Sequence, residues 1–154
     1  MKESTWIIIF IFLAIFLVGV GINFNKHYNV STIETGIVTD KNLVRLTRPL
    51  PNALVESPLV VSGEARGNWY FEASFPIKLY DANGKELTVA VAQAQGEWMT
   101  TEFVPFETIL TFPNPITPTG TLVLEKDNPS GLPEHADELR IPVRFNYTRT
   151  STQN

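Results

Sequence analysis

The sequence contains no cysteine and only two histidines among its 154 residues. The lack of cysteine excludes disulfide bonds, thiolate nucleophiles and cysteine-ligated zinc together. Twelve Lys and Arg residues against sixteen Asp and Glu residues give a formal net charge of −4, so the chain has no basic field to attract a nucleic-acid backbone. The composition also argues against disorder, because 44% of the residues are hydrophobic and only 18% are charged.

Residues that could support catalysis are equally sparse. The sequence has neither the G-x-S-x-G motif of a serine nucleophile nor the H-E-x-x-H motif of a zinc protease. Asp127, Asp137 and Glu138 carry the oxygen ligands that calcium prefers, but their spacing matches no known calcium loop. We therefore predict a protein that is not an enzyme, with no catalytic residue, no metal site and no cofactor.

One long apolar run stands near the start of the chain. Residues 6–22 read WIIIFIFLAIFLVGVGI, without a charged or strongly polar side chain. As a helix this run is about 25 Å long, slightly short of a hydrocarbon core of ~30 Å, and Asn23 and Phe24 can extend it. Lys2 and Lys26 can reach the two interfaces. We predict a transmembrane helix or signal anchor over residues 6–24, after a short tail at residues 1–5.

A cleaved signal peptide is the alternative that stays open. The apolar cores of signal peptides run to about 7–15 residues and end in an A-x-A-like site, whereas this run is longer and ends in Gly19-Val20-Gly21. The few flanking charges encode the orientation poorly. A short tail before a large C-terminal part favours an N-terminus on the inside. This predicts a single-pass protein of the cell membrane, with its C-terminal domain outside the cytoplasm.

The sequence after residue 42 has the pattern of β-strands, and residues 25–42 are predicted to be a spacer. Between Phe71 and Leu79 the apolar side chains take the odd positions, which is typical of an antiparallel strand with one buried face. Pro76 interrupts this strand and should lie at an edge or a bulge. The dipeptide Asn83-Gly84 then predicts a hairpin turn.

Similar alternation recurs along the remaining chain. The strand over residues 86–95 combines apolar Leu87, Val89 and Val91 with a run of Ala, and is predicted to be covered on both sides or narrowly packed. Five more strands are predicted near residues 43–48, 59–66, 104–112, 122–124 and 139–147. About seven short strands between Pro/Gly turns indicate an all-β sandwich over residues 43–148, before a polar tail at residues 149–154. A small barrel stays open, because the sequence does not show whether the sheet closes.

The stretch from Leu43 to Tyr147 resembles a known family. It reads SGEARGNWYFEASFP over residues 62–76, DANG over residues 81–84, GEWM over residues 96–99 and DNPSG over residues 127–131. In this combination it is similar to the immunoglobulin-like domain of bacterial spore germination. The resemblance implies an immunoglobulin-like antiparallel β-sandwich that works at the cell envelope, and it implies no catalytic activity.

Two tryptophans begin the candidate binding surface. Trp69 and Trp98 each follow a Gly by two residues, in a turn-like setting. Exposed indole rings there would bind a sugar or a partner protein, because Trp offers a large contact area at a small entropy cost. The other interpretation places both rings in the core, as sandwiches commonly do. Glu72 follows Trp69 closely and Glu97 directly precedes Trp98, so both carboxylates are candidates for the same surface.

The loop after the strand near residues 122–124 supplies the remaining candidates, Asp127, Asn128 and Ser130. Their side chains can bond to their own backbone, while Pro129 fixes φ and Gly131 allows a positive φ. The loop is therefore interpreted as a specific turn or, alternatively, as a rigid binding loop of the kind on which sandwiches carry function.

The prediction for function combines these parts. We expect a membrane-anchored, extracytoplasmic, non-catalytic immunoglobulin-like module that binds other envelope proteins or organises an envelope complex, in germination or another process. The alternative is a carbohydrate- or peptidoglycan-binding module that uses surface tryptophans. The expected partners are the membrane, through the N-terminal helix, and an envelope protein or a cell-wall glycan, with no nucleic acid and no small-molecule cofactor.

Overall fold

The computed structural model of the chain describes residues 38–40 and 42–147. The predicted anchor at residues 6–24 and the tails at residues 1–5 and 149–154 lie outside the described residues, as does most of the spacer. Within the described ranges, no helix is long and apolar enough to cross a bilayer.

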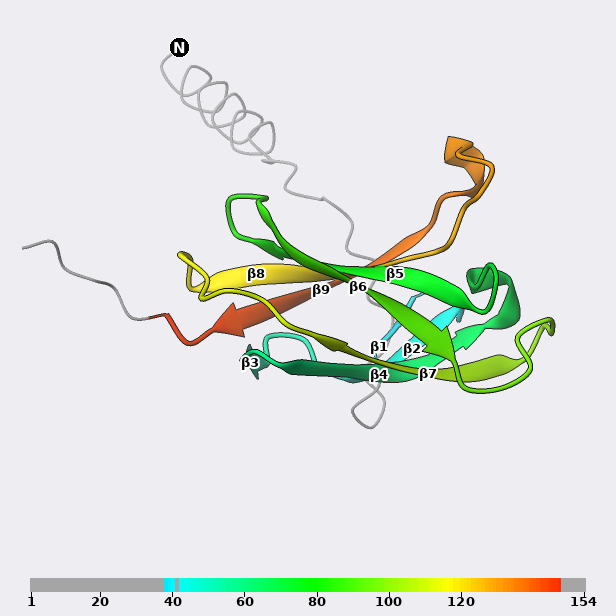
Figure 1. The fold of residues 1–154 in the computed structure, drawn as a ribbon, viewed down its shortest axis with the longest axis horizontal. Helices are drawn as coiled ribbons and strands as arrows, with labels where there is room; N and C mark the ends of the chain where they lie inside the picture. Colours follow the sequence, from blue (N-terminus) through cyan, green and yellow to red (C-terminus); the bar gives the residue numbers. More distant parts are fainter. Residues whose placement is uncertain (1–37, 41, 148–154) are drawn as a thin grey trace, which may run out of the picture.

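The described part is all-β, with nine strands and two short 3-10 helices, η1 (Gly67–Trp69) and η2 (Pro133–His135) (Figure 1). All seven predicted strand regions contain a strand. Two short strands, β1 and β3, were not predicted, and β1 falls within the residues assigned to the spacer. The strands are β1 (Val38–Asp40), β2 (Val44–Arg48), β3 (Leu54–Val55), β4 (Leu59–Arg66), β5 (Ser74–Asp81), β6 (Glu86–Ala94), β7 (Phe103–Leu110), β8 (Thr119–Glu125) and β9 (Glu138–Phe145).

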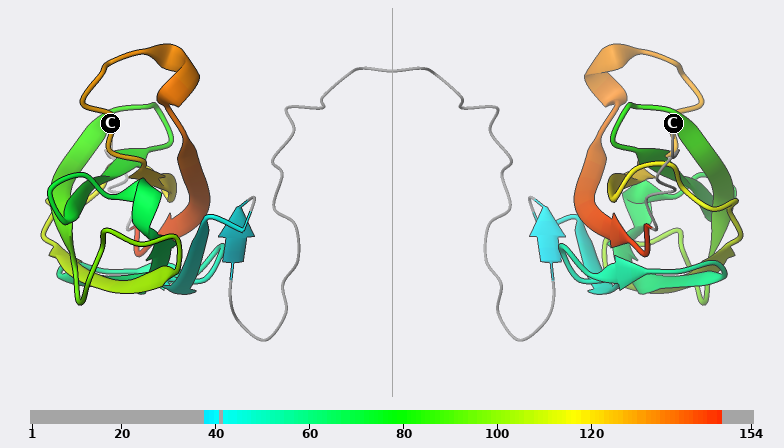
Figure 2. Two further views of the ribbon diagram at one scale, coloured as in Figure 1. Left: turned by 90° about the vertical axis from the view of Figure 1, so that its right-hand side faces the viewer. Right: turned by 90° about the vertical axis from the view of Figure 1, so that its left-hand side faces the viewer.

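The strands form one curled sheet in the order β1-β2-β4-β7-β6-β5-β8-β9-β3, with antiparallel pairing everywhere except between β3 and β9. Only two residue pairs, Gln93 with Glu107 and Ala94 with Phe106, join β6 to β7. The sheet bends there into two layers, β1-β2-β4-β7 and β6-β5-β8-β9-β3, as the end-on views in Figure 2 show. Among the described residues no β1–β3 pairing closes it, so the sandwich interpretation fits better than the barrel.

The core lies between the layers and follows the predicted alternation. In β5 the side chains of Phe75, Ile77 and Leu79 are buried, and in β9 the same holds for every second residue from Leu139 to Phe145. Burying these apolar surfaces provides the main driving force for the fold. Tyr147, predicted to continue the β9 series, is exposed because the strand ends at Phe145.

The start of β5 differs from the prediction, because a tight turn occupies residues 71–74. The backbone N–H groups of Phe71 and Ser74 each donate to the other residue's carbonyl, at 3.0 Å. Between them Glu72 and Ala73 have φ values of 50° and 62°, the left-handed conformation of a two-residue hairpin turn. Phe71 and Ala73 therefore precede the strand rather than continuing its buried face.

The predicted hairpin between β5 and β6 is confirmed. Asp81 Oδ1 accepts hydrogen bonds from the backbone N–H of Asn83 at 2.8 Å and of Lys85 at 2.9 Å, and Gly84 takes a positive φ of 79°. Pro76 precedes the first β5–β8 pair, which joins Ile77 to Leu124. It therefore lies at a local edge of β5, where its missing N–H is tolerated.

Candidate functional site

Trp69 is a core residue rather than part of a surface. Its side chain is 1% exposed, and its ring meets that of Phe75 edge to face at a centroid distance of 6.5 Å. Phe75 in turn contacts Phe106 at 4.9 Å. Aromatic pairs in these geometries stabilise beyond the area that they bury. Of the two interpretations given for Trp69, the core one is therefore correct, because its indole is enclosed by the two layers.

The neighbouring Tyr70 is buried as well and fixes the same cluster. Its hydroxyl donates to the carbonyl oxygen of Val104 at 2.7 Å. Burial raises the pKa of Tyr70 well above its usual value, because the interior disfavours the phenolate. The phenol thus stays protonated and serves as a hydrogen-bond donor between the layers.

Trp98 lies next to η1, half-buried against the core. A Cβ atom at Gly67 would overlap the carbonyl oxygens of Trp98 and Thr100, so only glycine allows the two tryptophan segments to approach this closely. The sequence placed both tryptophans in similar settings, and the structure brings their segments together. They do not form an exposed pair, because Trp69 faces inward.

Glu72 and Glu97, the acidic companions of the tryptophans, are both exposed. Glu72 sits at the tip of the turn before β5, and Glu97 Oε1 accepts a hydrogen bond from the backbone N–H of Met99 at 2.9 Å. Within the described residues, no hydrogen bond or ion pair joins these two carboxylates to each other or to the loop after β8. They therefore remain separate surface groups in this structure.

Residues 126–137, which we call the 126–137 loop, carry the other three candidates. Asn128 Nδ2 donates to the carbonyl of Leu132 at 2.8 Å, and Ser130 Oγ donates to Asn128 Oδ1 at 2.6 Å. Ser130 Oγ also accepts from the Leu132 N–H at 3.2 Å, and Gly131 takes a φ of 65°. The predicted turn chemistry is present, and the loop is held by its own side chains.

The base of the 126–137 loop is tied to the core. The backbone N–H of Asp127 donates to the carbonyl of Trp69 at 3.1 Å, and the N–H of Lys126 donates to the carbonyl of Asp137 at 2.9 Å. The backbone of the buried Trp69 thus fixes the start of the loop, next to Asp127 and Asn128.

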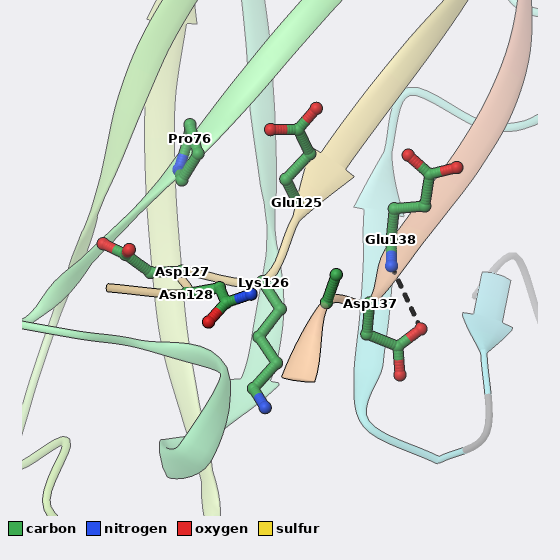
Figure 3. Close-up of a pocket in the computed structure, with 8 residues that line it drawn as sticks. Pro76, Glu125, Lys126, Asp127, Asn128, Asp137 and Glu138 are labelled. Carbon is green, nitrogen blue, oxygen red and sulfur yellow. Dashed lines mark hydrogen bonds between the residues drawn. The ribbon is translucent and has the colours of Figure 1, made fainter. Parts of the chain in front are cut away.

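A groove of about 610 Å³ opens beside this loop (Figure 3). Asp127 and Asn128 stand on one side of it, with Asp137 and Glu138 on the other. Asp127 and Asn128 are the only two of the seven predicted candidates that line the groove, and Ser130 lies outside it. The lining residues are Pro76, Glu125, Lys126, Asp127, Asn128, Ala136, Asp137 and Glu138.

Two acidic groups at the groove already have cationic partners. Lys78 Nζ lies 2.7 Å from Glu125 Oε2, and this hydrogen bond raises the pKa of Lys78. Arg140 Nε lies 2.6 Å from Glu138 Oε1. Among the described residues, no group of three or more His, Cys, Asp or Glu side chains is arranged to hold a metal ion. The groove's chemistry is that of a polar, net acidic recess.

A second surface feature was not predicted. Val89 and Val91 of β6 are 51% and 53% exposed, and Ile109 of β7 is 58% exposed. The expectation that β6 is covered on both sides is therefore wrong, because its Ala side faces the core and its Val side faces outward. The signal was present in the sequence as alternation of Val and Ala, but small residues do not reveal which side is buried.

Comparison with known proteins agrees with this architecture. No curated protein matches the sequence. Residues 43–131, more than half of the chain and the part that runs from β2 to the 126–137 loop, match the immunoglobulin-like domain of bacterial spore germination. The resemblance noted in the sequence is thereby confirmed, and the curled all-β sheet fits it: the chain belongs to the family of the immunoglobulin-like domain of bacterial spore germination.

Proposed function

We propose that this chain is a membrane-anchored, extracytoplasmic, non-catalytic module that binds another protein of the cell envelope through the groove beside the 126–137 loop. The apolar run at residues 6–22 supports the anchor, since a helix extended through Asn23 and Phe24 is long enough for a bilayer span. Membership of an immunoglobulin-like family supports a binding role carried by loops on a rigid sandwich.

The groove is the observation that carries the proposal. Four carboxylates line it against one ammonium group, that of Lys126. Glu125 and Glu138 are neutralised by Lys78 and Arg140, whereas no ion pair engages Asp127 among the described residues. A partner that presents Lys or Arg side chains complements this recess. The backbone bond from Asp127 to Trp69 holds the recess in place before binding, which lowers the entropy cost of recognition.

The test is capture of the partner by the full chain in its native membranes. After chemical cross-linking, mass spectrometry should find one reproducible envelope protein with the wild-type chain. Asp127→Lys should abolish its recovery, because the substitution reverses the charge inside the groove. Glu134→Lys makes the same charge change in the same loop but outside the groove lining, and should leave recovery intact. Recovery of abundant background proteins alone would overturn the proposal.

The carbohydrate-binding alternative has less support. It requires two exposed indole rings on one face, and the ring of Trp69 is enclosed in the core. We therefore propose protein binding rather than wall-glycan binding.

A further inference from the structure

The groove beside the 126–137 loop opens where the pairing of β5 with β8 stops. Pro76 precedes the first β5–β8 pair. The N–H of Asp81 donates to Lys85 on the β6 side, and backbone groups alternate in direction along a strand, so position 76 faces β8. A proline has no N–H to donate there, and the ladder ends. The two strands therefore part at Pro76 and Glu125, which both line the groove (Figure 3).

Beyond Pro76 the wall of the groove continues onto β6. Pro76 pairs with Val91 of β6, and residues directly opposite each other in an antiparallel pair project from the same face, with Cβ atoms about 5 Å apart. Val89 lies two residues along β6 and projects from that face as well. We call Val89 and Val91 the valine shelf. The shelf and the groove are thus neighbouring parts of one outer surface of the layer β6-β5-β8-β9.

The valine shelf is apolar and uncovered by the described part of the chain. About half of each valine is exposed, and residues 88–95 carry no charge. The charged residue beside Val89 is its ladder partner Lys78, which is bound to Glu125. An apolar area next to a polar recess is the usual arrangement of a protein interface, in which apolar contacts are flanked by charged groups.

One partner segment can occupy both the groove and the shelf. Two strand spacings, about 10 Å, separate Val91 from Glu125 at the groove. In an extended segment, side chains two residues apart project from the same face and lie about 7 Å from each other. The flexible stem of a Lys or Arg spans the remaining distance. A cation in the acidic groove therefore brings an apolar side chain two residues away over the shelf.

We infer that the envelope partner binds through an extended segment in which a Lys or Arg enters the groove and an apolar side chain two residues away packs on the valine shelf. This inference rests on the proposed function, because the acidic groove places the cation. It adds a second determinant of recognition. Asp127 selects the charge of the partner, and Val89 and Val91 select the side chain beside that charge.

Two labelled pentapeptides with blocked ends test this pattern, Val-Ser-Arg-Ser-Val and Thr-Ser-Arg-Ser-Thr. They have the same charge and nearly the same shape, and their symmetry allows binding in either chain direction. The full chain in nanodiscs of neutral lipid should bind the valine peptide at least about fivefold more tightly, because only valine gains from burial on the shelf. Fluorescence anisotropy, corrected with empty nanodiscs, measures both Kd values.

Variants of the shelf show whether it is the source of this preference. Val89→Thr/Val91→Thr should abolish the preference and leave the weaker binding of both peptides, and thermal melting checks its fold, since both positions are exposed and Thr is also β-branched. Ile116→Thr makes a similar change at an exposed residue before β8 and should keep the preference. A wild type without the preference, or a preference that survives in the double variant, would overturn the inference.

Asp127→Lys separates this inference from the proposed function. It should abolish binding of both peptides by reversing the charge in the groove. If the wild type binds both peptides equally and Asp127→Lys binds neither, the groove stands and the role of the shelf is wrong. If Asp127→Lys changes nothing, or the wild type binds neither peptide, the groove proposal falls as well. A double variant that alters only sedimentation or lipid binding would assign the shelf to a second copy or a bilayer, against the inference.

Discussion

Two valines on the outer surface of the same layer have opposite environments. Val123 of β8 is 0% exposed, although it points away from the core, whereas Val91 of β6 is 53% exposed. Both alternate with inward residues on their strands. The difference therefore comes from their neighbours and not from the direction of the side chain.

Val123 has a strand on each side. It pairs with Lys78 of β5 and with Arg140 of β9, so both side chains stand beside it on the same face of the sheet. Their charged ends bind Glu125 and Glu138. Long cationic side chains commonly cover apolar surface in this way. Val91 pairs with Pro76 of β5 and has no ladder partner of its own on β7. An outward valine is thus hidden inside a sheet and exposed at an edge.

The largest expected contrast comes from truncating the two valines. Val123→Ala should lower the free energy of unfolding by about 2 kcal/mol, since it removes two buried methyl groups and leaves a small cavity. Val91→Ala should change it by less than about 0.5 kcal/mol, as is usual for exposed positions. Urea denaturation followed by tryptophan fluorescence measures both. Similar losses in the two variants would show that Val91 is as well covered as Val123.

A smaller effect is expected when the cover over Val123 is removed. Lys78→Ala should cost about 1 kcal/mol, because it deletes both a half-buried ion pair and the stem beside Val123. Lys85→Ala, in the exposed β5–β6 hairpin, is the control and should be neutral within the error of urea denaturation. If Lys78→Ala is equally neutral, burial of Val123 depends on other neighbours.

The smallest effect concerns the charge of Lys78 alone. Glu125→Gln should cost about 0.5 kcal/mol at neutral pH, because it keeps the stem of Lys78 and removes only the ion pair. The hydrogen bond to Glu125 raises the pKa of Lys78 above its usual 10.5. The contribution of the Lys78–Glu125 ion pair to the free energy of unfolding is therefore fully present below pH 10.5. It is lost as the pH rises through the higher pKa that Lys78 has in the folded state. The difference between wild type and Glu125→Gln should shrink over that range in denaturation curves, and a constant difference would rule out titration of Lys78 as its source.

Much of the sheet could be predicted from local patterns. Strict alternation with large side chains fixes both a strand and its buried face, as Phe75, Ile77 and Leu79 show. Where the residues are small, alternation gives the strand but not the face. For β6, only one of the two alternatives, cover on both sides, is wrong. The two-residue β3 has no pattern to detect, because its single ladder to β9 depends on contacts far apart in the sequence.

The candidate site was less predictable for a related reason. Asp127, Asn128 and Ser130 were found because turn chemistry is local, and their mutual bonds confirm it. The role of Trp69 was ambiguous, since a tryptophan beside a glycine suits either a surface or a core. Tertiary packing decided for the core, and the groove itself arises from residues of three separate segments that no local pattern connects.

Hydrogen exchange at Val89 and Val123 tests the central comparison most directly. The claim is that Val123 has a strand on each side, whereas Val89 has a ladder partner on β5 alone among the described residues. The Ala94 N–H donates toward β5, and strand groups alternate in direction, so the N–H of Val89 points away from β5. The amide of Val89 should therefore exchange at least about tenfold faster than the amide of Val123. Equal exchange rates at the two positions would contradict the account.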